Sequence, residues 1–364
     1  GIRTGMYISP HLVDYPERMQ LGGQEISQAD FAAAIDHTKA AAAAIQAAGM
    51  ESPTEFEVLT AAAFYWFARQ RAEMVVVEVG LGGLLDSTNV IVPEISLITN
   101  VTLEHTDRCG DTVAEIAVHK AGIIKPGVPV VTGAAGEALA VIEATAAKNR
   151  SDCRVLNRDF FVSDYRCSST EPSFSVTIGA ALPQPFHIQL LGRHQADNAA
   201  LAICACQWLA EKEPRLTPEA IQAGVAKATW PGRFEVFHES PLVILDGAHN
   251  PDGIRTLRQT LDDVFPARPL VFLFGVLADK NHAVMEKLLF RSCDRVVVVA
   301  PNSPRAAAAV DIANEITAGA VEAIAADSIA AGLAMARSWA GPTGIVCVAG
   351  SLYMIGEARQ LLRQ

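Results

Sequence analysis

The stretch Pro241-Leu242-Val243-Ile244-Leu245-Asp246-Gly247-Ala248-His249-Asn250-Pro251 decides the fold. Its first part is an apolar run typical of a buried strand, and the segment from Asp252 onward has the pattern of a helix. Asp246, His249 and Asn250 therefore place a carboxyl group, an imidazole and an amide at the carboxyl end of a strand. Open α/β sheets bind their ligands at that edge. The stretch predicts an α/β fold with a functional site where this strand ends.

A second strand of the same kind ends far upstream, where Met74–Val77 runs into Glu78-Val79-Gly80-Leu81-Gly82-Gly83. A carboxylate at the end of a strand buried on both faces needs a partner, commonly a cation or a metal ion. Glu78 can equally accept hydrogen bonds from the loop amides of Gly80–Gly83. A dinucleotide-binding motif fits poorly, because its third glycine would fall at Leu85. Two strand-end sites in one chain predict a reaction held between two domains.

The composition narrows the class of protein. The chain has 364 residues, half of them apolar, which is enough for two domains with cores of their own. A formal net charge of −11 argues against a nucleic-acid surface, which needs clustered Lys and Arg. The seven cysteines form no C-x-x-C pair and are typical of reduced thiols. No run approaches the roughly 18 apolar residues of a spanning helix, so we expect a soluble, cytoplasmic protein with no membrane partner.

From Pro241 onward, strands and helices alternate regularly, which predicts a doubly wound, Rossmann-like domain. Its strands are expected at 242–245, 270–274, 295–300, 321–324 and 344–348. Its helices are expected near 252–264, 283–291, 307–317, 327–339 and 351–363.

The first part of the chain predicts a second α/β domain. Its helices are expected at 27–49, 55–71, 112–121, 197–211 and 218–227, and its strands at 74–79, 95–99 and 128–132. Short alternating runs at 174–178 and 186–190 predict a small antiparallel sheet. Turn residues cluster around 231–241, so the predicted domains are 1–237 and 238–364.

Two side chains near the upstream strand ends have two interpretations each. His105 follows the next strand, so its imidazole can join Glu78 around Mg²⁺ when substrate phosphates complete the octahedron, or it can serve as a hydrogen-bonding group. Lys120 falls in the last turn of a helix, where a cation is stabilised by the negative helix end. From the residues alone, that structural role of Lys120 is favoured over a functional one.

Two further segments are equally open. Gln195 and Asn198 lie three residues apart on one helix face, where they can contact a nucleobase edge or cap the helix. Arg233 lies at the predicted domain junction, where its guanidinium can hold a phosphate or pair with Glu235.

Taken together, these segments resemble the folylpolyglutamate synthase/dihydrofolate synthase family, within the Mur-ligase-like ATP-dependent amide ligases. The resemblance covers nearly the whole chain, and the order and spacing of the segments make it specific. The matching segments are Ser9–Leu12, Phe56–Thr60, Glu78–Gly83, Asp86–Asn89, Glu104–Thr106, Lys120–Ile123, His194-Gln195 with Asn198, Pro231–Arg233, Asp246–Pro251 and Gly350–Tyr353. The resemblance implies an N-terminal P-loop-type ATPase domain, incomplete here and carrying the small antiparallel sheet, followed by the Rossmann-like domain.

The resemblance also implies roles that the residues alone left open. Lys120 matches a lysine that is carbamylated in the family, which turns a cation into an anion that helps to hold a second Mg²⁺. The implied metal ligands are Ser9, Glu78, His105 and carbamylated Lys120. The implied ATP contacts are Asn198, Arg233, Asp246 and His249, and the implied pterin contacts are Phe56, Asp86 and the neighbouring Ser87. Lys120, Asp246 and His249 are the implied catalytic residues.

The implied reaction is the ATP-dependent ligation of L-glutamate to dihydropteroate or to a folate, in folate biosynthesis and one-carbon metabolism. ATP phosphorylates the acceptor carboxylate, the amino group of glutamate attacks the acyl phosphate, and phosphate leaves as the amide forms. Electrostatic stabilisation of the transferring phosphoryl group is the main task of such a site. The expected cofactors are ATP and two Mg²⁺, with K⁺ as an assisting cation. The expected partners are small molecules, and a monomer is expected.

Two features depart from the family pattern. The family has a glycine-rich phosphate loop before the Ser-Pro-His segment, whereas this chain contains no G-x-x-x-x-G-K-[ST] motif. The chain also starts at Gly1 without an initiator Met, so we expect an upstream segment that carries the loop, and little or no turnover from these 364 residues alone. Leu84 stands where the family usually has Arg, which puts the choice of substrate in doubt.

Two alternative functions remain at the level of sequence. One is a non-catalytic homologue that has lost its phosphate loop and binds folate or a partner. The other is a cell-wall Mur ligase, against which the Asp86–Asn89 loop and the absence of a uridine-nucleotide domain argue.

Overall fold

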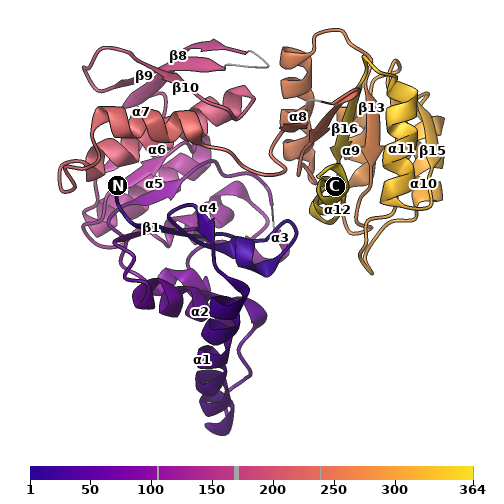
Figure 1. Cartoon of the computed structure of the whole chain (residues 1–364). Coiled ribbons are helices and arrows are strands. Elements are labelled where there is room, and N and C mark those ends of the chain that lie inside the picture. The colour runs from indigo at the N-terminus through magenta and orange to yellow at the C-terminus, as the bar shows by residue number, and fades with distance from the viewer. Residues whose placement is uncertain (105, 168–171, 238, 364) are drawn as a thin grey trace. The chain divides into compact units, whose positions relative to one another are not determined.

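The computed structural model describes residues 1–104, 106–167, 172–237 and 239–363 (Figure 1). The chain divides into two compact units. The first comprises 1–161, 178–181 and 198–221, and the second comprises 162–177, 182–197 and 222–364. The predicted domain boundary at 237/238 stays a prediction. Within the described residues, no helix combines the length and the apolar character that crossing a membrane requires.

The second unit is built on a six-stranded sheet. Its order is β11-β12-β16-β13-β14-β15, and every neighbouring pair from β12 to β15 is parallel, while β11 runs antiparallel to β12. The bounds are β11 (Glu235–Phe237), β12 (Leu242–Leu245), β13 (Val271–Phe274), β14 (Arg295–Val298), β15 (Glu322–Ala325) and β16 (Ile345–Ala349). The strands predicted from continuous apolar runs are thus confirmed to within one or two residues.

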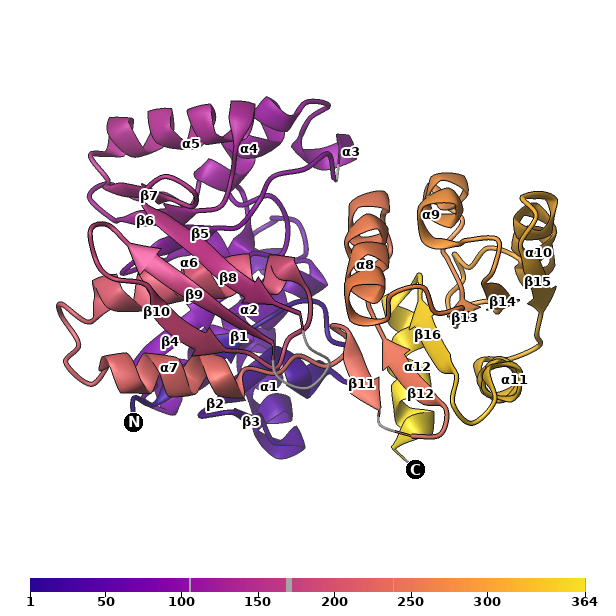
Figure 2. The same cartoon turned by 90° about the horizontal axis from the view of Figure 1, so that it is seen from above.

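Helices cover both faces of this sheet, as a doubly wound fold requires (Figure 2). One face carries α8 (Pro251–Val264), α9 (His282–Leu289) and α10 (Ala309–Ala318), and the other carries α11 (Ile329–Ala340) and α12 (Leu352–Leu362). Phe272 and Phe274 are fully buried under the first face, and both contact the ring of Phe290 edge-on. Each such side chain contributes about 1.5–3 kcal/mol by leaving water.

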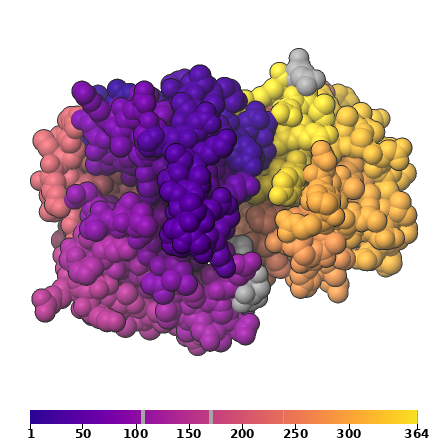
Figure 3. All heavy atoms as spheres, turned by 90° about the horizontal axis from the view of Figure 1, so that it is seen from below, coloured from indigo at the N-terminus to yellow at the C-terminus, as the bar shows by residue number. Residues whose placement is uncertain are grey.

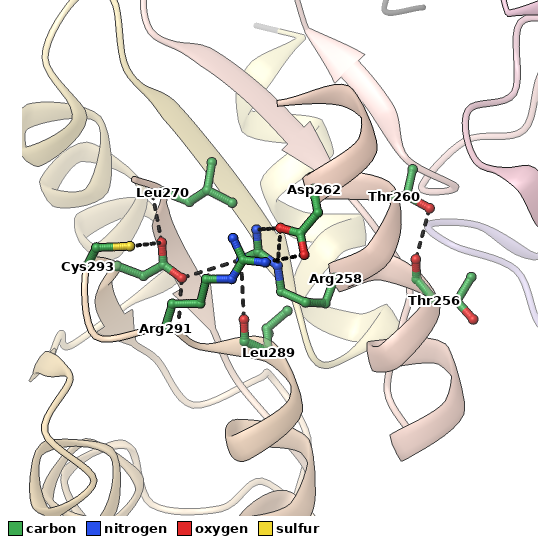
Figure 4. Close-up of polar contacts among 9 residues, drawn as sticks. Thr256, Arg258, Thr260, Asp262, Leu270, Leu289, Arg291 and Cys293 are labelled. Atoms are coloured by element: carbon green, nitrogen blue, oxygen red, sulfur yellow. Dashed lines mark hydrogen bonds and ion pairs between the residues drawn. The ribbon is translucent and has the colours of Figure 1, made fainter. Parts of the chain in front are cut away.

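A buried arginine stabilises the α8 side of the second unit (Figure 4). Arg258 is 7% exposed; its Nε donates to Asp262 at 3.0 Å and its Nη1 to Asp294 at 3.4 Å. Asp294 also accepts from the backbone amides of Leu270 and Arg291, each at 3.0 Å. The charges are therefore buried as a hydrogen-bonded network, which is how buried ions are tolerated.

The first unit contains one mixed sheet and one parallel sheet. In one, β1 pairs in parallel with β4 and antiparallel with β2, in the order β3-β2-β1-β4. In the other, β5, β6 and β7 are all parallel. The bounds are β1 (Thr4–Tyr7), β2 (Met19–Leu21), β3 (Gln24–Glu25), β4 (Met74–Val77), β5 (Ser96–Ile98), β6 (Val130–Thr132) and β7 (Cys153–Val155).

The local sequence explains why helices form around these strands. α2 begins at a capping box, in which Thr54 and Glu57 each bind the other's backbone amide. α1 is alanine-rich and projects from the rest of its unit in Figure 1, toward the side from which Figure 3 is viewed. The bounds are α1 (Gln28–Ala47), α2 (Glu55–Arg69), α3 (Thr106–Cys109), α4 (Val113–Ala121), α5 (Gly136–Asn149), α6 (Arg193–Leu209) and α7 (Pro218–Lys227), with short 3₁₀ turns η1 (Tyr15–Arg18) and η2 (Ser87–Val90).

The predicted antiparallel sheet is present, with β8 (Phe160–Arg166), β9 (Ser173–Ile178) and β10 (Gln184–His187) in the order β10-β9-β8. β10 lies two residues earlier than the predicted strand at 186–190, and it pairs antiparallel with β9. Phe174 and Phe186 stack across this pair with ring centroids 5.8 Å apart.

Candidate functional site

The parallel strands β1 and β4 deliver Ser9 and Glu78 to the same edge of a sheet. Glu78 continues the ladder, since its N–H donates to the carbonyl of Tyr7 at 2.9 Å. The N–H of Ser9 then donates to the Glu78 carboxylate at 2.8 Å. Two of the residues implied as metal ligands are therefore in direct contact. His105, the third, lies outside the described residues, and Lys120 is treated below.

A cavity of about 630 Å³ opens beside this edge. Its walls come from the segment after β1, the start of α2, the loop at 80–87 and the helices α3 and α4. Ser9, Phe56, Asp86 and Ser87 all line it, so the cavity brings one residue implied as a metal ligand together with the three implied as pterin contacts. A drug-sized organic ligand fits a volume of this order.

Phe56 forms an aromatic wall of the cavity, and Gly80 allows it to lie there. A Cβ on Gly80 would be 2.4 Å from Cζ of Phe56, so any larger residue would displace the ring. Behind Phe56, the ring of Tyr7 stacks at a centroid distance of 6.1 Å. Burial raises the pKa of the Tyr7 hydroxyl, which bonds Thr60 at 3.1 Å. Gly80 therefore serves the close packing of the Phe56 ring against the loop after β4.

Asp86 organises the loop that closes the cavity. Its Oδ2 accepts the N–H of Leu81 at 2.8 Å, and its Oδ1 accepts the N–H of Thr88 at 2.9 Å and the Thr88 hydroxyl at 2.5 Å. The loop amide of Leu81 is thus bound by Asp86, while Glu78 binds Ser9. One interpretation of the sequence was that Glu78 accepts hydrogen bonds from the amides of Gly80–Gly83. In the structure, the amide of Leu81 in this loop donates to Asp86.

Three basic side chains in the cavity wall were not found by sequence reasoning: Arg18, Arg108 and His119. Arg18 is held by its Nε, which donates to Nδ1 of His11 at 2.9 Å. Burial and the Arg18 charge lower the pKa of His11, which keeps that nitrogen available as an acceptor. Arg18 lies in a 3₁₀ turn and Arg108 in a four-residue helix, so neither had a periodic pattern to mark it.

Lys120 occupies the last turn of α4, next to His119, and its side chain is half-buried. The position agrees with both the helix-end role and the carbamylated role, and neither is tested by the geometry. Asn198 is exposed on α6 within the first unit.

In the second unit, Asp246 follows β12 and is 8% exposed. Its two carboxylate oxygens accept the N–H groups of Phe234 and Ala248, each at 2.9 Å. Burial raises the pKa of Asp246, and the charges of Arg233 and His249 together with these amide bonds oppose that rise. Among the described contacts, Arg233 does not pair with Glu235, which was the alternative interpretation. The Glu235 carboxylate instead accepts from Nε of Arg359, at 2.8 and 3.0 Å from its two oxygens.

His249 follows β12 at the carboxyl edge of the six-stranded sheet, and His194 lies at the start of α6 in the same unit. Nδ1 of His249 is 2.7 Å from the carbonyl of Gly247, and the next residue, Asn250, caps α8 by accepting the N–H of Gly253 at 2.7 Å. Burial, followed by the positive charge of Arg233, lowers the pKa of His194 to about 4. Nε2 of His194 is 3.1 Å from Nε2 of Gln195.

Ser351 is a further residue at this edge that sequence reasoning did not single out for a role. It follows β16 and precedes α12, and its side chain is 3% exposed. Its hydroxyl has no hydrogen-bond partner among the residues that the structure describes. A buried hydroxyl without a partner costs about 1–3 kcal/mol, which a ligand at this edge would recover.

Comparison with known proteins places these features in a family. Residues 29–206 match the Mur ligase middle domain, and residues 232–352 match the glutamate ligase domain of Mur ligases. The chain is 34% identical over its whole length to the dihydrofolate synthase/folylpolyglutamate synthase of Bacillus subtilis, covering 85% of that protein, and 35% identical to the folylpolyglutamate synthase of Lacticaseibacillus casei, covering 84%.

The fold agrees with the same group of proteins. The structure of the folylpolyglutamate synthase of Mycobacterium tuberculosis, solved with ADP and AMPPCP, superposes with a TM-score of 0.90 at 32% identity; the match covers 100% of this chain and 85% of that one. The Mur-ligase-like α/β fold expected from the sequence is therefore confirmed. This chain belongs to the folylpolyglutamate synthase/dihydrofolate synthase family of Mur ligases.

Proposed function

We propose that this chain is an ATP-dependent ligase that joins L-glutamate to dihydropteroate, to a folate or to both. The observation that carries the proposal is the match, over the whole chain, to relatives named for these activities. The same match favours this function over a cell-wall Mur ligase and over a non-catalytic homologue. The chemistry is phosphorylation of the acceptor carboxylate by ATP, followed by attack of the glutamate amino group on the acyl phosphate.

The cavity of the first unit supports the acceptor part of the proposal. A pterin is flat and aromatic, and the ring of Phe56 offers it a stacking surface. Arg18 and Arg108 add positive charge to the same wall, which suits a substrate that carries carboxylates. Leu84, which stands where the family usually has Arg, is 44% exposed and directly precedes the cavity-lining segment Leu85–Ser87. We propose that Arg18 and Arg108 provide the cationic character that Leu84 does not.

The strand-end residues of the first unit suit the expected Mg²⁺. The Glu78 carboxylate and the Ser9 hydroxyl group are hard oxygen donors on adjacent strands, and Mg²⁺ prefers such oxygens. Bound Mg²⁺ would supply charge neutralisation for the transferring phosphoryl group. We propose Ser9, Glu78 and His105 as its ligands, with carbamylated Lys120 at a second ion; an assisting K⁺ stays a prediction.

The strand-end residues of the second unit suit an anionic nucleotide. Arg233 is exposed and presents a guanidinium that can bind a phosphate in a bidentate manner. Asp246 fixes the backbone of the loop between β12 and α8, and His249 is positioned within that loop. We propose Arg233, Asp246 and His249, together with Asn198 of the first unit, as ATP contacts. The cytoplasmic location and the monomeric state stay predictions.

The experiment that tests the function is an assay of glutamate-dependent ADP and phosphate release. It compares dihydropteroate with tetrahydrofolate as acceptor, on the protein encoded by the complete natural reading frame that contains this chain. Release with at least one acceptor, abolished when glutamate is omitted, is the expected result. Absence of release with both acceptors would refute the proposal. The 364-residue chain, assayed in parallel, tests the expectation of low turnover.

A further inference from the structure

A cluster of three potential metal ligands lies between α9 and α10 in the second unit. It has no role in the proposed reaction. His282 and Glu286 are one turn apart on α9, and Glu315 belongs to α10. One ligand atom from each of the three lies within 4.8 Å of the others. The cluster is made by residues of a single compact unit.

The atoms of this cluster lie close together, with two contacts between the imidazole and the carboxylates. Nδ1 of His282 is 3.2 Å from Oε2 of Glu315 and 3.4 Å from Oε1 of Glu286. Nδ1 of His282 and Oε1 of Glu286 are both buried, and neither has a hydrogen-bond partner among the described residues. Buried polar atoms without partners are rare in native proteins, and a bound ion or water commonly satisfies them.

The separations fit a metal site. Ligand atoms held about 2.0–2.1 Å from a tetrahedral Zn²⁺ lie about 3.4 Å from one another. The observed 3.2 and 3.4 Å separations are close to that value. The side chain of Glu286 is 11% exposed and that of Glu315 is 49% exposed, so one ligand is anchored inside while the other faces solvent. Such an arrangement gives an ion a path of entry and leaves a position for water.

The electrostatics of the cluster favour a cation. The carboxylates of Glu286 and Glu315 both lie beside the single imidazole of His282, at 3.4 and 3.2 Å from its Nδ1. Two carboxylates held this close to one another repel each other. A divalent ion would relieve this repulsion and satisfy both buried atoms at once.

We propose that Nδ1 of His282 and the carboxylates of Glu286 and Glu315 bind a divalent transition-metal ion, with Zn²⁺ as the best fit. The set of one imidazole and two carboxylates suits zinc, and the fourth position is left to water. The ion clamps α9 to α10 and stabilises the second unit by binding the folded state alone. The site is independent of the ligase reaction.

The test is calorimetric titration of Zn²⁺ into the chelator-treated protein, in buffer without Mg²⁺ or nucleotide. The variant Glu315→Gln removes the exposed ligand with little risk to folding, because that side chain is half exposed. We expect it to weaken binding by at least the ~10–100-fold that loss of an outer-shell partner causes. We also expect Zn²⁺ to raise the Tm of the wild type by several degrees and that of Glu315→Gln by much less.

Two matched controls locate the binding. Glu322→Gln removes a carboxylate on β15 that is 60% exposed and lies outside the cluster, and it should bind Zn²⁺ like the wild type. Glu78→Gln alters the proposed Mg²⁺ site of the first unit and should also retain this binding. Equal affinity of the wild type and Glu315→Gln, or a loss confined to Glu78→Gln, would overturn the proposal. Failure of the ligase assay would leave this result unaffected, so the two proposals are separately testable.

Discussion

The backbone N–H of Ser9 donates a 2.8 Å hydrogen bond to the carboxylate of Glu78, a residue 69 positions later in the chain. The contact exists because β1 and β4 are parallel neighbours, so both residues leave the sheet at its carboxyl edge. It binds the loop after β1 to the end of β4 beside the cavity. The carboxylate thus has a structural role as well as the proposed metal-binding role, and a substitution can separate the two.

Glu78→Gln is expected to preserve the fold and abolish most of the activity. The amide oxygen of Gln can still accept from Ser9, whereas a neutral group is a much weaker Mg²⁺ ligand. We expect kcat/KM to fall by about 100-fold or more, which corresponds to about 2.7 kcal/mol of transition-state stabilisation. Steady-state assays over a Mg²⁺ series measure this, with an unchanged Tm as the check on folding.

The matched control for that variant is Glu94→Gln. Glu94 forms an exposed ion pair with Lys212 in the same unit, and such pairs contribute about 0–1 kcal/mol. Its activity should equal that of the wild type. Full activity of Glu78→Gln at all Mg²⁺ concentrations would remove Glu78 from the proposed metal site.

Gly80→Ala is expected to impair both packing and the use of the pterin substrate. The added Cβ would lie 2.4 Å from the ring of Phe56, which must move within the cavity wall. Overpacking of this kind costs typically about 1–3 kcal/mol. We expect lower stability in urea and a raised KM for the pteroate or folate acceptor, with the KM for glutamate less affected.

Gly224→Ala serves as the opposite control, because a Cβ at this exposed position of α7 meets nothing within 4 Å. It should stabilise the chain by about 0.5–1 kcal/mol and leave the KM unchanged. If Gly80→Ala also raised the stability and left the KM unchanged, the position of the Phe56 ring would not depend on the absence of a side chain at Gly80.

The five parallel strands of the six-stranded sheet in the second unit could be predicted from the sequence, whereas its antiparallel strand β11 was not predicted. The strand at 242–245 was predicted exactly where β12 lies, because strands buried on both faces leave uninterrupted apolar runs. α5, in the first unit, was not predicted, because its N-cap residue Ala135 makes no side-chain cap and its first residue is Gly136. The predicted helix at 197–211 begins earlier, at Arg193, directly after Gly192 with its φ of +106°.

The candidate site could be predicted only in part. Strand ends are visible in the sequence, so Ser9, Glu78 and Asp246 could be selected from strand position or resemblance. Arg18 and Arg108 could not, because their place in the cavity depends on short irregular turns. The His282–Glu286 spacing is visible in the sequence, but the approach of Glu315 is a tertiary contact.

Arg258→Met is expected to destabilise the second unit strongly. The substitution leaves the carboxylate of Asp294, whose side chain is 1% exposed, without its cation. Breaking a buried pair from one side costs about 3–5 kcal/mol. Equilibrium urea unfolding measures the loss. Arg255→Met, on the same helix with a side chain that is 59% exposed, should change stability by less than about 0.5 kcal/mol. Similar values for the two variants would contradict the role assigned to the Arg258 network.

His194 makes the second unit less stable in acid. Burial and the charge of Arg233 lower its pKa to about 4 in the folded state, from about 6.5 in an unfolded chain. The unfolded state therefore binds a proton that the folded state excludes. The stability that neutral His194 contributes is fully present above pH 6.5 and is lost as the pH falls toward 4. The loss should amount to about 1–3 kcal/mol by pH 4.

Urea unfolding of the wild type and of His194→Gln, measured at steps between pH 7 and pH 4, isolates this contribution. As the pH falls, the free energy of unfolding of the wild type should decrease more than that of His194→Gln, because Gln has no proton to bind. His187→Gln is the control, since His187 is exposed on β10 and its replacement should leave the pH profile of the wild type intact. A His194→Gln profile parallel to that of the wild type over this range would show that His194 titrates alike in the folded and unfolded states, and that its burial beside Arg233 does not restrain its proton.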